Sequence, residues 1–455
     1  MLLPYLKLTF RILNVITTFF ITAAHHRLTS IYHRLTYHAL PPEKCRNILI
    51  LGGSFAGLQA ARLLAHSVPT GHRVILIEKN SHFHWTFAFP RYSVVRGHES
   101  TAFIPFSGIA DGAPTGVFTH VQDKATCVRD DVVELASGAV IPYEYLAIAT
   151  GTAMGPPARV FATEKKEGCE ELKRMQRVIE KAERIAVVGG GAVGVQLACD
   201  IKSYHPGKRV VLVHSREKLL NRFGDRLHAY AIKALQELGV EVVLSERPEI
   251  PKANVEGGGS IITPTTMTLH FKSNGKTETF DLILPCTGSP PLSSPLAHLS
   301  PTSISPTTSS ILVHPTLQLL DPQYPNIFAL GDVAETGGAK SAIAGMTQAE
   351  VVAANIRTLI SRERSGEEMK ARMRMARGGG SVGLRRYQPG FFEGILKLTL
   401  GKNHTVLYIQ TQDGKESGSE FLKSVKGGRW HRDDGGMDLG RAWRELGVKV
   451  GDFSA

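Results

Sequence analysis

The stretch "NILILGGSFAGLQAARLLA" at residues 47–65 decides the fold of this chain. An apolar run ends at a glycine-rich turn, and apolar residues then recur at helical spacing before a second apolar run at 73–78. This order predicts a β-α-β unit. The stretch "RIAVVGGGAVGVQLACDI" at 184–201 repeats the pattern and leads into "RVVLVH" at 209–214. Two such units predict two nucleotide-binding domains of similar plan rather than one long sheet.

Both glycine turns have the spacing of dinucleotide-binding turns. The first glycine of such a turn permits the bend from strand to helix, the second lets the backbone approach a pyrophosphate, and the third lets the helix pack on the strand. The helix then meets the phosphate charge with free N–H groups and its dipole. The first turn has serine in place of the second glycine. The residues of the two turns are Gly52, Gly53, Ser54, Gly57, Gly189, Gly191 and Gly194.

The strands that follow the two turns end on different residues. Glu78 ends the first and His214 the second, each about 20 residues beyond the last glycine of its turn. A glutamate there accepts hydrogen bonds from both hydroxyls of an adenosine ribose, so the first site is predicted to hold FAD. A histidine removes the charge that would repel a 2′-phosphate, and Arg216 could bind that phosphate. The second site therefore fits NADPH, or NADH bound through other contacts with Arg216 as a surface residue.

Strand patterns and loop-rich stretches predict the remaining organisation. Each β-α-β unit is followed by strand-like alternation, at 132–152 and 266–288, and Asn274-Gly275 is typical of a hairpin turn. The predicted class is α/β, with two nested Rossmann-like domains and a small C-terminal α+β domain. The predicted parts are a membrane-attachment or targeting segment at 1–44, an FAD-binding domain at 45–155 and 287–361, an NAD(P)-binding domain at 156–286, a basic flexible insert at 362–388 and the C-terminal domain at 389–455.

Length and composition fit a folded protein with more than one domain. The chain has 455 residues, of which 42% are hydrophobic and 21% charged, and one ordinary core does not extend over that length. The net charge of +12 comes largely from two segments. Residues 1–46 carry six lysines and arginines against one glutamate, and residues 361–386 carry eight against three acids. A solvated tail and a solvated loop explain these segments more simply than a nucleic-acid site.

The cysteines exclude two kinds of chemistry. The five present stand alone in the sequence, without a CxxC pair or a metal-ligand spacing; they are Cys45, Cys127, Cys169, Cys199 and Cys286. Their odd number argues against a disulfide framework, and we expect reduced structural thiols and no metal. Disulfide reduction, which relies on a CxxC dithiol beside the flavin, is therefore excluded.

The first 24 residues, "MLLPYLKLTFRILNVITTFFITAA", contain two cations, no acid and an uncharged run from Ile12 to Ala24. That run is shorter than the roughly 20 residues of a bilayer span. A mitochondrial presequence, a single membrane anchor and an amphipathic interfacial helix all remain open. We expect membrane attachment through this segment, on a mitochondrial membrane or on the cytoplasmic face of another intracellular membrane.

Three further motifs indicate a family: "LAIATGT" at 146–152, "LILPCTGS" at 282–289 and "NIFALGDVAE" at 326–335. They resemble the strand-end ATG, the second CTG and the GD motif of flavoproteins in the pyridine nucleotide-disulfide oxidoreductase superfamily. Together with "AKSAIAGMTQAEVVAANI" and "YQPG", they make the chain similar to the apoptosis-inducing-factor-like group, above all to ferroptosis suppressors and their fungal relatives. The likeness runs from about residue 47 to 410, without the insert at 362–386.

This resemblance implies an FAD-dependent NAD(P)H oxidoreductase that passes electrons to a quinone or a similar acceptor. It implies that Asp332 binds the ribityl hydroxyls of FAD, that Arg91 contacts the FAD, and that the backbone near Lys124 meets the adenine. Lys340 would lie beside the flavin and stabilise negative charge on its reduced ring. Lys340 and Gln196 are the candidate catalytic residues. The candidate cofactor-binding residues are Gly52, Gly53, Ser54, Phe55, Ala56, Gly57, Glu78, Lys79, Arg91, Lys124, Thr150, Gly151, Gly189, Gly191, Ala192, Gly194, His214, Arg216, Gly288 and Asp332.

The chain departs from its relatives at two positions. Gln196 stands where relatives often carry glutamate, which removes a titratable group near the nicotinamide and puts a proton relay there in doubt. Leu2 stands where the animal ferroptosis suppressor has the glycine needed for myristoylation, so the hydrophobic N-terminus could replace the lipid.

Two other functions stay open beside the quinone reductase. One is a redox-gated binding protein with slow turnover, whose basic surface at 361–386 would meet DNA or a protein partner. The other is a flavin monooxygenase, for which no motif is found. Trp430 or Trp443 could cover the flavin, although core packing is the simpler interpretation.

Overall fold

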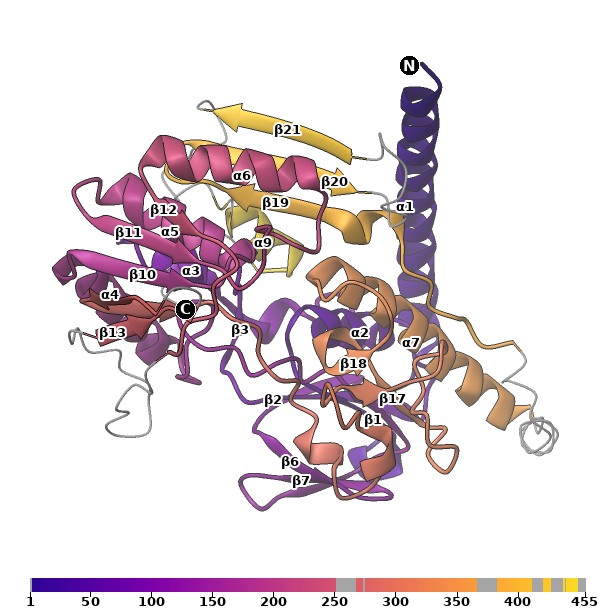
Figure 1. Ribbon diagram of the computed structural model, residues 1–455. Helices are drawn as coiled ribbons and strands as arrows, with labels where there is room; N and C mark the ends of the chain where they lie inside the picture. The colour runs from indigo at the N-terminus through magenta and orange to yellow at the C-terminus, as the bar shows by residue number, and fades with distance from the viewer. Residues whose placement is uncertain are drawn as a thin grey trace. The chain divides into compact units, whose positions relative to one another are not determined.

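The structure, a computed structural model, describes residues 2–250, 267–272, 275–365, 383–410, 420–426, 437 and 439–448. The predicted α/β class is confirmed, because the chain forms two compact units that each contain a parallel sheet (Figure 1). Unit 1 contains Met1–Lys79, Phe106–Ala153 and Pro290–Glu393, and unit 2 contains Asn80–Pro105, Met154–Ser289 and Gly394–Ala455. The domain boundaries given above stay predictions. Asn274, Trp430 and residues 366–382 of the basic insert lie outside the described residues.

The core of unit 1 is a parallel sheet of five strands in the order β17-β9-β1-β2-β5. After Arg46, β1 is buried at every position, as expected for a parallel strand covered on both faces. Helix α2 contacts β1 and β2 and packs along α7 (Figure 1). These elements are β1 (Arg46–Leu51), α2 (Phe55–Ala65), β2 (His72–Glu78), β5 (Phe118–Gln122), β9 (Tyr145–Ile148), β17 (Ile327–Ala329) and α7 (Ala342–Arg364).

Two smaller sheets and a long helix complete the described part of unit 1. β6, β7 and β8 form an antiparallel sheet, and β16 pairs with β18. Their bounds are β6 (Ala125–Val128), β7 (Val132–Leu135), β8 (Val140–Pro142), β16 (Ile311–Leu312) and β18 (Ala334–Glu335). The N-terminal helix α1 (Leu2–Thr36) contacts this unit through His33, whose Nε2 lies 2.6 Å from Val68 O. None of the described helices combines the length and apolar character that crossing a membrane requires.

The core of unit 2 is a second parallel sheet, with four strands in the order β12-β11-β10-β15. The predicted hairpin forms as the antiparallel pair β13 and β14. The strands are β10 (Arg184–Val188), β11 (Arg209–Val213), β12 (Glu241–Val243), β13 (Met267–His270), β14 (Thr277–Phe280) and β15 (Leu282–Pro285). The helices are α3 (Phe89–Tyr92), α4 (Lys165–Lys181), α5 (Ala192–Tyr204) and α6 (Asp225–Leu238).

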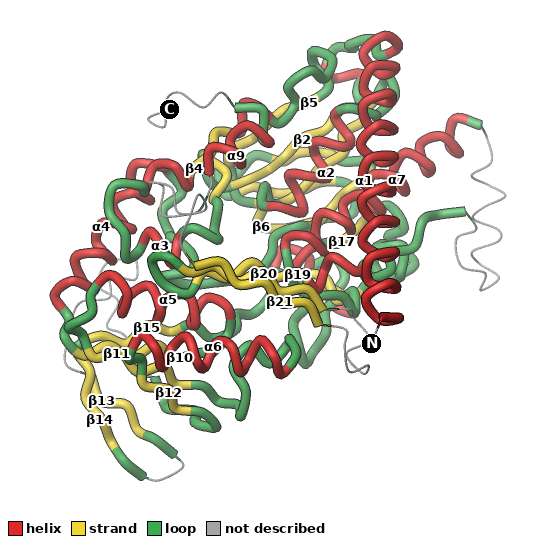
Figure 2. Tube along the Cα trace, turned by 90° about the horizontal axis from the view of Figure 1, so that it is seen from above, coloured by secondary structure: helices red, strands yellow, loops and turns green. Residues whose placement is uncertain are grey.

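The described C-terminal residues form an antiparallel sheet that lies beside α6 in both views (Figures 1 and 2). Its inner residues Leu398, Val406 and Tyr408 share one hydrophobic core with α5 and α6. A further antiparallel pair, β3 with β4, joins the segment that carries α3. The remaining elements of this unit are β3 (His82–His84), β4 (Phe103–Pro105), β19 (Ile395–Thr399), β20 (His404–Gln410), β21 (Glu420–Lys426) and α9 (Leu439–Glu445).

Candidate functional site

The first glycine turn joins β1 to α2 and leaves no room for side chains. Gly52 has φ +100°, and a Cβ there would lie 2.5 Å from the main-chain oxygen of Ala149. A Cβ on Gly57 would lie 1.8 Å from the main-chain oxygen of Gly52. Only glycine lets the end of β1, the first turn of α2 and the end of β9 approach so closely.

The second glycine turn, between β10 and α5, repeats this geometry. Gly189 has φ +126°, and a Cβ there would lie 2.3 Å from the main-chain oxygen of Cys286. A Cβ on Gly194 would lie 1.8 Å from the oxygen of Gly189. Gly191 has no neighbouring atom within 4 Å of a built Cβ, which suits a backbone that a pyrophosphate approaches. The chain thus contains two copies of one close-packed turn.

Ser54 and Gly191 occupy the same position in the two turns. Each is the N-cap residue of its helix, with extended backbone, at φ −81° and −78° respectively. Phe55 and Ala56 then begin α2, as Ala192 begins α5. Ser54 is exposed and its hydroxyl does not cap α2 in the described structure. Both helices therefore start with first-turn N–H groups of the kind that bind phosphate.

Glu78 and His214 make equivalent hydrogen bonds to the middle residue of their turns. Gly53 N–H donates to Glu78 Oε2 over 2.6 Å, and Gly190 N–H donates to His214 Nδ1 over 3.0 Å. Both side chains are buried. Burial lowers the pKa of His214, so its ring is neutral near pH 7 and accepts with Nδ1 as the carboxylate does. Histidine therefore keeps the structural hydrogen bond of the acid and removes its charge.

The cations near His214 differ in what they bind. Arg216 is exposed two residues beyond the histidine, whereas Lys218 forms an ion pair of 2.7 Å with Asp225. Arg216 is therefore the nearer candidate for a 2′-phosphate, as the sequence suggested. At the first site, Lys79 follows Glu78 and is partly buried.

Each of the motifs that end β9 and β15 contains a glycine with free space around it. Gly151 has φ +70° and, like Gly288, has no atom within 4 Å of a built Cβ. The hydroxyl of Thr150 donates to Leu292 O over 2.7 Å, which fixes the loop after β9. The predicted cofactor contacts of these three residues stay predictions.

The GD motif forms a tight turn stabilised from α7. Gly331 has φ +74°, and its N–H donates to Gln348 Oε1 over 2.7 Å. Lys340 Nζ donates to Asp332 O over 3.2 Å and also to Ala334 O. The ammonium group of Lys340 thus lies against the main chain of the residues that the resemblance assigns to FAD. Sequence reasoning missed Gln348, although it lies inside the "GMTQAE" stretch of the family motif.

Tyr387 is a second residue that sequence reasoning missed. A Cβ on Gly338 would lie 2.1 Å from its hydroxyl oxygen, so the ring packs on the loop just before Lys340. That hydroxyl donates to Glu393 Oε2 over 2.7 Å, and burial raises the pKa of Tyr387. Tyr387 belongs to the "YQPG" motif, which gave its only sequence signal.

Arg91 forms a buried ion pair in unit 2. Its Nη2 and Nε lie 2.7 and 3.1 Å from the carboxylate oxygens of Asp200, and Nη2 also donates to Gly401 O over 2.8 Å. Arg91 is 1% exposed and Asp200 0%. The pair therefore ties α3 to α5, the helix that starts at the second glycine turn. Contact of Arg91 with FAD stays a prediction.

Gln196 and Lys124 complete the candidate residues. Gln196 lies one helical turn before Asp200 on α5, and its side chain interacts with that carboxylate. Lys124 N–H donates to Asp123 Oδ1 over 2.7 Å, and Lys124 O accepts from Ala136 N–H over 2.9 Å. The roles assigned to both stay predictions.

The cysteines match the expected structural thiols. All five are free, and burial raises the pKa of Cys286 to about 12 and that of Cys169 to about 11. Thiols with such pKa values hold almost no thiolate at neutral pH. Within the described part of the chain, no group of His, Cys, Asp and Glu side chains is arranged to hold a metal ion.

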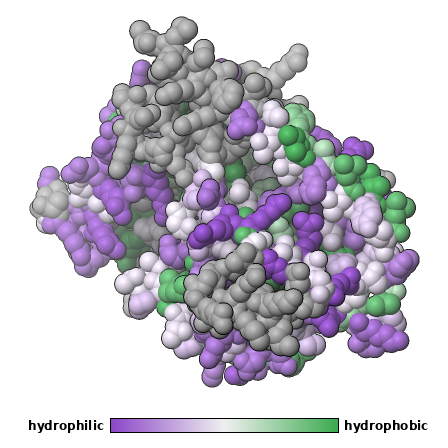
Figure 3. Space-filling view, turned by 90° about the vertical axis from the view of Figure 1, so that its right-hand side faces the viewer, coloured by the Kyte–Doolittle hydropathy of each residue, from purple (hydrophilic) through white to green (hydrophobic). Residues whose placement is uncertain are grey.

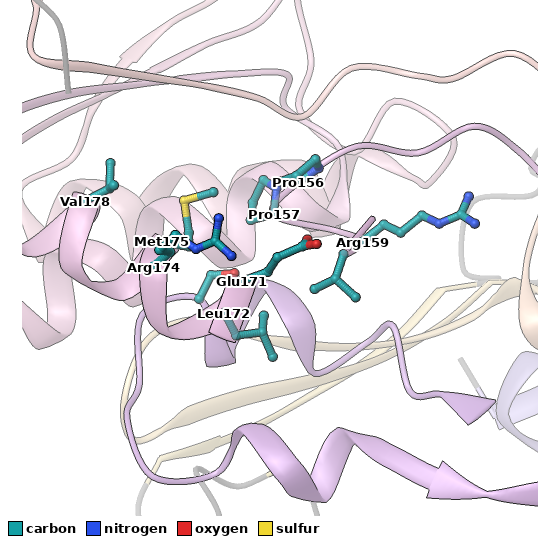
Figure 4. Close-up of a pocket in the computed structure, with 10 residues that line it drawn as sticks. Pro156, Pro157, Arg159, Glu171, Leu172, Arg174, Met175 and Val178 are labelled. Atoms are coloured by element: carbon teal, nitrogen blue, oxygen red, sulfur yellow. The ribbon is translucent and has the colours of Figure 1, made fainter. Parts of the chain in front are cut away.

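A small cavity in unit 2 is separate from the predicted cofactor residues. Its volume is about 40 Å³, and Figure 4 shows side chains of α4 facing the segment with Pro156 and Pro157. The carboxylate of Glu171 there accepts N–H bonds from Phe161 and Ala162, so it secures a loop. The indole of Trp443 is also structural, because it is 0% exposed and its Nε1 donates to Thr101 O over 2.8 Å.

Comparisons with known proteins agree with the geometry of the two turns. The pattern of the pyridine nucleotide-disulphide oxidoreductase family matches residues 46–351. Fe-regulated protein 8 of Mycosarcoma maydis is 35% identical over 357 residues, which are 73% of this chain and 84% of that protein. Ferroptosis suppressor protein 1 of Xenopus tropicalis is 26% identical over 89% of this chain and 97% of its own. The sulfide:quinone oxidoreductase of Aquifex aeolicus has a similar fold, with TM-score 0.64 and 16% identity over 90% of this chain and 94% of that one.

Proposed function

This chain belongs to the pyridine nucleotide-disulphide oxidoreductase family, and we propose that within it the protein passes electrons from NAD(P)H through FAD to a quinone-type acceptor. It is an oxidoreductase whose cofactors are FAD and NAD(P)H. The observation that carries the proposal is the pair of matched turns, one closed by the anionic Glu78 and the other by the neutral His214. Two dinucleotide sites of different charge in one chain suit two different nucleotides.

The residues present fit both cofactors. The first turn, with Glu78 at its ribose position, would hold the adenosine part of FAD, because added Cβ atoms at Gly52 and Gly57 would fill the space that the turn needs. The second turn would hold NAD(P)H in the same way at Gly189 and Gly194. Bound FAD supplies the redox chemistry, accepting a hydride from the nicotinamide and releasing electrons to the acceptor.

The protein side chains would orient the cofactors and supply charge. Lys340 holds a positive charge on the turn at Asp332, where it would favour an electron-rich flavin ring. Gln196 has no titratable proton, so we assign it a positioning role at most and no proton relay. Reduction of a quinone to the quinol by NAD(P)H takes up one proton besides the hydride, and water would supply that proton.

The chemical identity of the electron acceptor is the more specific part of the proposal. The sequence has no CxxC pair, and the buried thiols are held protonated, so a disulfide is a poor acceptor despite the name of the family. A quinone fits the resemblance to ferroptosis suppressors. Quinones with long tails dissolve in bilayers, so an enzyme that reduces them needs a surface that binds a membrane. The N-terminal helix is the candidate for that surface.

Helix α1 has two opposite faces. One face docks on unit 1, where His26 pairs with Glu350 at 3.0 Å and His33 binds Val68 O. The other face exposes large apolar side chains, each between 49% and 77% exposed: Phe20, Ile21, Leu28, Ile31, Tyr32 and Leu35. At 3.6 residues per turn these positions form one stripe opposite the docked histidines.

We propose that this stripe rests in the interfacial layer of a membrane. The sequence from residue 1 to 42 contains no acid, and the exposed Arg27 and Arg34 suit anionic lipid headgroups. The membrane would be mitochondrial or another intracellular membrane, as the sequence suggested. Vesicle flotation of Leu28→Ser/Leu35→Ser should show reduced membrane binding. Val140→Ser removes an apolar side chain that is 55% exposed elsewhere on unit 1, so its binding should stay unchanged; equal losses would contradict the proposal.

The main test is an anaerobic spectroscopic titration of the purified protein. We expect a yellow protein that NADH or NADPH bleaches and that a soluble quinone recolours rapidly. A protein that stays colourless after reconstitution with FAD would sink the proposal. Bleaching with turnover no faster than free flavin, together with salt-dependent DNA binding, would favour the redox-gated binding protein instead.

The coenzyme preference is tested at Arg216. Replacing it by glutamate should raise KM for NADPH about tenfold, as expected for loss of a charge-assisted contact, and leave KM for NADH nearly unchanged. Arg222→Glu makes the same charge change at another exposed position and serves as the control. An unchanged ratio of the two KM values in Arg216→Glu would return Arg216 to the status of a surface residue.

A further inference from the structure

A network of hydrogen bonds in unit 1 joins the turn of the GD motif to a carboxylate that the proposed reaction does not use. Gly331 N–H donates to Gln348 Oε1 over 2.7 Å, and the hydroxyl of Tyr387 donates to Glu393 Oε2 over 2.7 Å. The side chain of Gln348 also forms a hydrogen bond with the Tyr387 hydroxyl, which connects the two bonds. We call these four residues the Glu393 network.

The side chains of the Glu393 network are buried. Figure 3 looks onto the side of the molecule where α7 ends, and hydrophilic side chains prevail over the described part of that face. Gln348, Tyr387 and Glu393 do not contribute to such a surface, because they are 1%, 6% and 3% exposed. Buried polar groups need partners inside the protein. Both oxygens of Glu393 have one, since Oε1 accepts from Gly390 N–H over 3.0 Å and Oε2 accepts from the phenol.

The carboxylate fixes the direction of the bonds in the network. A carboxylate accepts hydrogen bonds and does not donate them, whereas a phenol has one proton. Tyr387 uses that proton on Glu393, so its oxygen is left to accept from Gln348 Nε2. The amide oxygen of Gln348 is thereby turned toward Gly331 N–H. Glu393 thus decides, through Tyr387, which end of the amide meets the turn of the GD motif.

The turn that receives this amide lies against the first dinucleotide turn. Gly331 has φ +74°, and a Cβ there would lie 3.1 Å from the Cβ of Ala56 in the first turn of α2. The next residue, Asp332, is proposed to bind FAD, and its main-chain oxygen accepts from Lys340 Nζ over 3.2 Å. A displacement of this turn would therefore move several groups that are proposed to hold the cofactor.

We propose that Tyr387 and Glu393 are positioning residues for FAD, which act through Gln348 on the turn of Gly331 and Asp332. The inference rests on the proposed role of that turn in binding FAD. Loss of either side chain should weaken FAD binding, because the Gln348 amide is then free to turn its NH₂ group toward Gly331 N–H.

The test compares Tyr387→Phe with Tyr324→Phe in the full chain. Tyr324 also donates its hydroxyl proton to a carboxylate, that of Asp130, over 3.1 Å. It precedes β17, whereas Gly331 follows that strand. Both variants therefore lose the same atom and the same kind of bond. Titration of FAD with apoprotein, followed by flavin fluorescence, measures Kd for FAD, and urea unfolding measures the stability of each apoprotein.

We expect Tyr387→Phe to raise Kd for FAD about tenfold, because a buried carboxylate oxygen loses its donor and the amide loses its fixed direction. Tyr324→Phe should raise it less than about twofold. At saturating FAD, KM for NAD(P)H should stay within about twofold of wild type in both variants, because the second glycine turn belongs to unit 2. Equal Kd values for FAD in the two variants, or a KM for NAD(P)H that rises in parallel with Kd for FAD, would overturn the proposal.

Glu393→Gln tests the direction of the bonds, and it decides the question if Tyr387→Phe does not fold. Glutamine has the size of glutamate but only one side-chain oxygen, whereas Gly390 N–H and the phenol each need one. We expect Kd for FAD to rise about fivefold. The control is Asp130→Asn, the same kind of change at the other pair. Equal Kd values for FAD in Glu393→Gln and Asp130→Asn would refute the role of the carboxylate.

A double variant tests whether the effect passes through Gln348. In Gln348→Met, Gly331 N–H has lost its acceptor, so adding Tyr387→Phe should raise Kd for FAD by less than about twofold more. Two effects that multiply in full would show that Tyr387 acts independently of Gln348, against the proposal. A wild-type protein that does not bind FAD would overturn the proposed function together with this inference, whereas tight binding by wild type and by every variant would overturn this inference alone.

Discussion

Replacing Asp200 by asparagine should destabilise unit 2 more than any exposed charge change. The carboxylate accepts two hydrogen bonds from Arg91, and both side chains are almost fully buried. Asparagine keeps the shape but leaves the guanidinium without a counterion. Removing one partner of such a buried pair costs about 3–5 kcal/mol of unfolding free energy.

An exposed ion pair serves as the control for this loss of stability. Glu170 and Lys173 form an ion pair of 2.9 Å with side chains 48% and 44% exposed. Glu170→Gln should change the free energy of unfolding far less than Asp200→Asn does, because water screens an exposed pair. The double variant Arg91→Met/Asp200→Leu removes both charges, so its cost should be smaller than that of Asp200→Asn.

Urea unfolding followed by tryptophan fluorescence measures these differences. Trp85 and Trp443 both lie in unit 2, so the signal follows that unit. A loss in Asp200→Asn no larger than that in Glu170→Gln would refute the account of the pair. If Arg91 instead serves FAD directly, Arg91→Met/Asp200→Leu should lose FAD affinity without a matching loss of stability.

Three other predictions follow from packing and burial. Gly57→Ala should give a protein that binds little FAD, and Gly194→Ala should give one that keeps FAD but is not reduced by NAD(P)H. In each variant the added Cβ would lie 1.8 Å from a main-chain oxygen. Visible absorbance spectra measure both effects, and Gly207→Ala, whose Cβ would meet no atom within 4 Å, is the control. Burial lowers the pKa of His33, so the neutral ring stabilises the docked position of α1 above about pH 6.5, and this stabilisation is lost as the pH falls. Limited proteolysis of α1 should therefore be faster at about pH 5.5 than at about pH 7.5. The variant His33→Gln should show a weaker dependence of the proteolysis rate on pH. Treatment with N-ethylmaleimide should leave turnover within about twofold, because the pKa of Cys286 is raised to about 12; a tenfold loss of activity would contradict this.

The two nucleotide-binding turns were predictable because their signals are local. A strand run, a glycine turn and a helical repeat lie within twenty residues of one another, and the glycine spacing follows from steric contacts inside that stretch. The different charges of Glu78 and His214 were visible for the same reason. What the sequence did not indicate is that His214 accepts a hydrogen bond from Gly190, which depends on how β11 lies beside β10.

Other parts of the site depend on residues far apart in the chain. Asp200 reaches Arg91 across 109 positions, and Gln348 reaches Gly331 across 17. No periodicity or motif relates such residues, since their contact is set by which helices pack together. The assignment of Arg91 to FAD followed the family motif alone, and only the structure showed the carboxylate that binds its guanidinium.

By itself the sequence determined the fold class, the two turns, the lack of a redox-active cysteine pair and the unusual N-terminal segment, because each is written in neighbouring residues. Only the tertiary structure decided which face of α1 is exposed and which buried side chains are paired, as Arg91 is with Asp200. The physical reason is that burial and charge pairing are properties of a packed neighbourhood, which chain order leaves open.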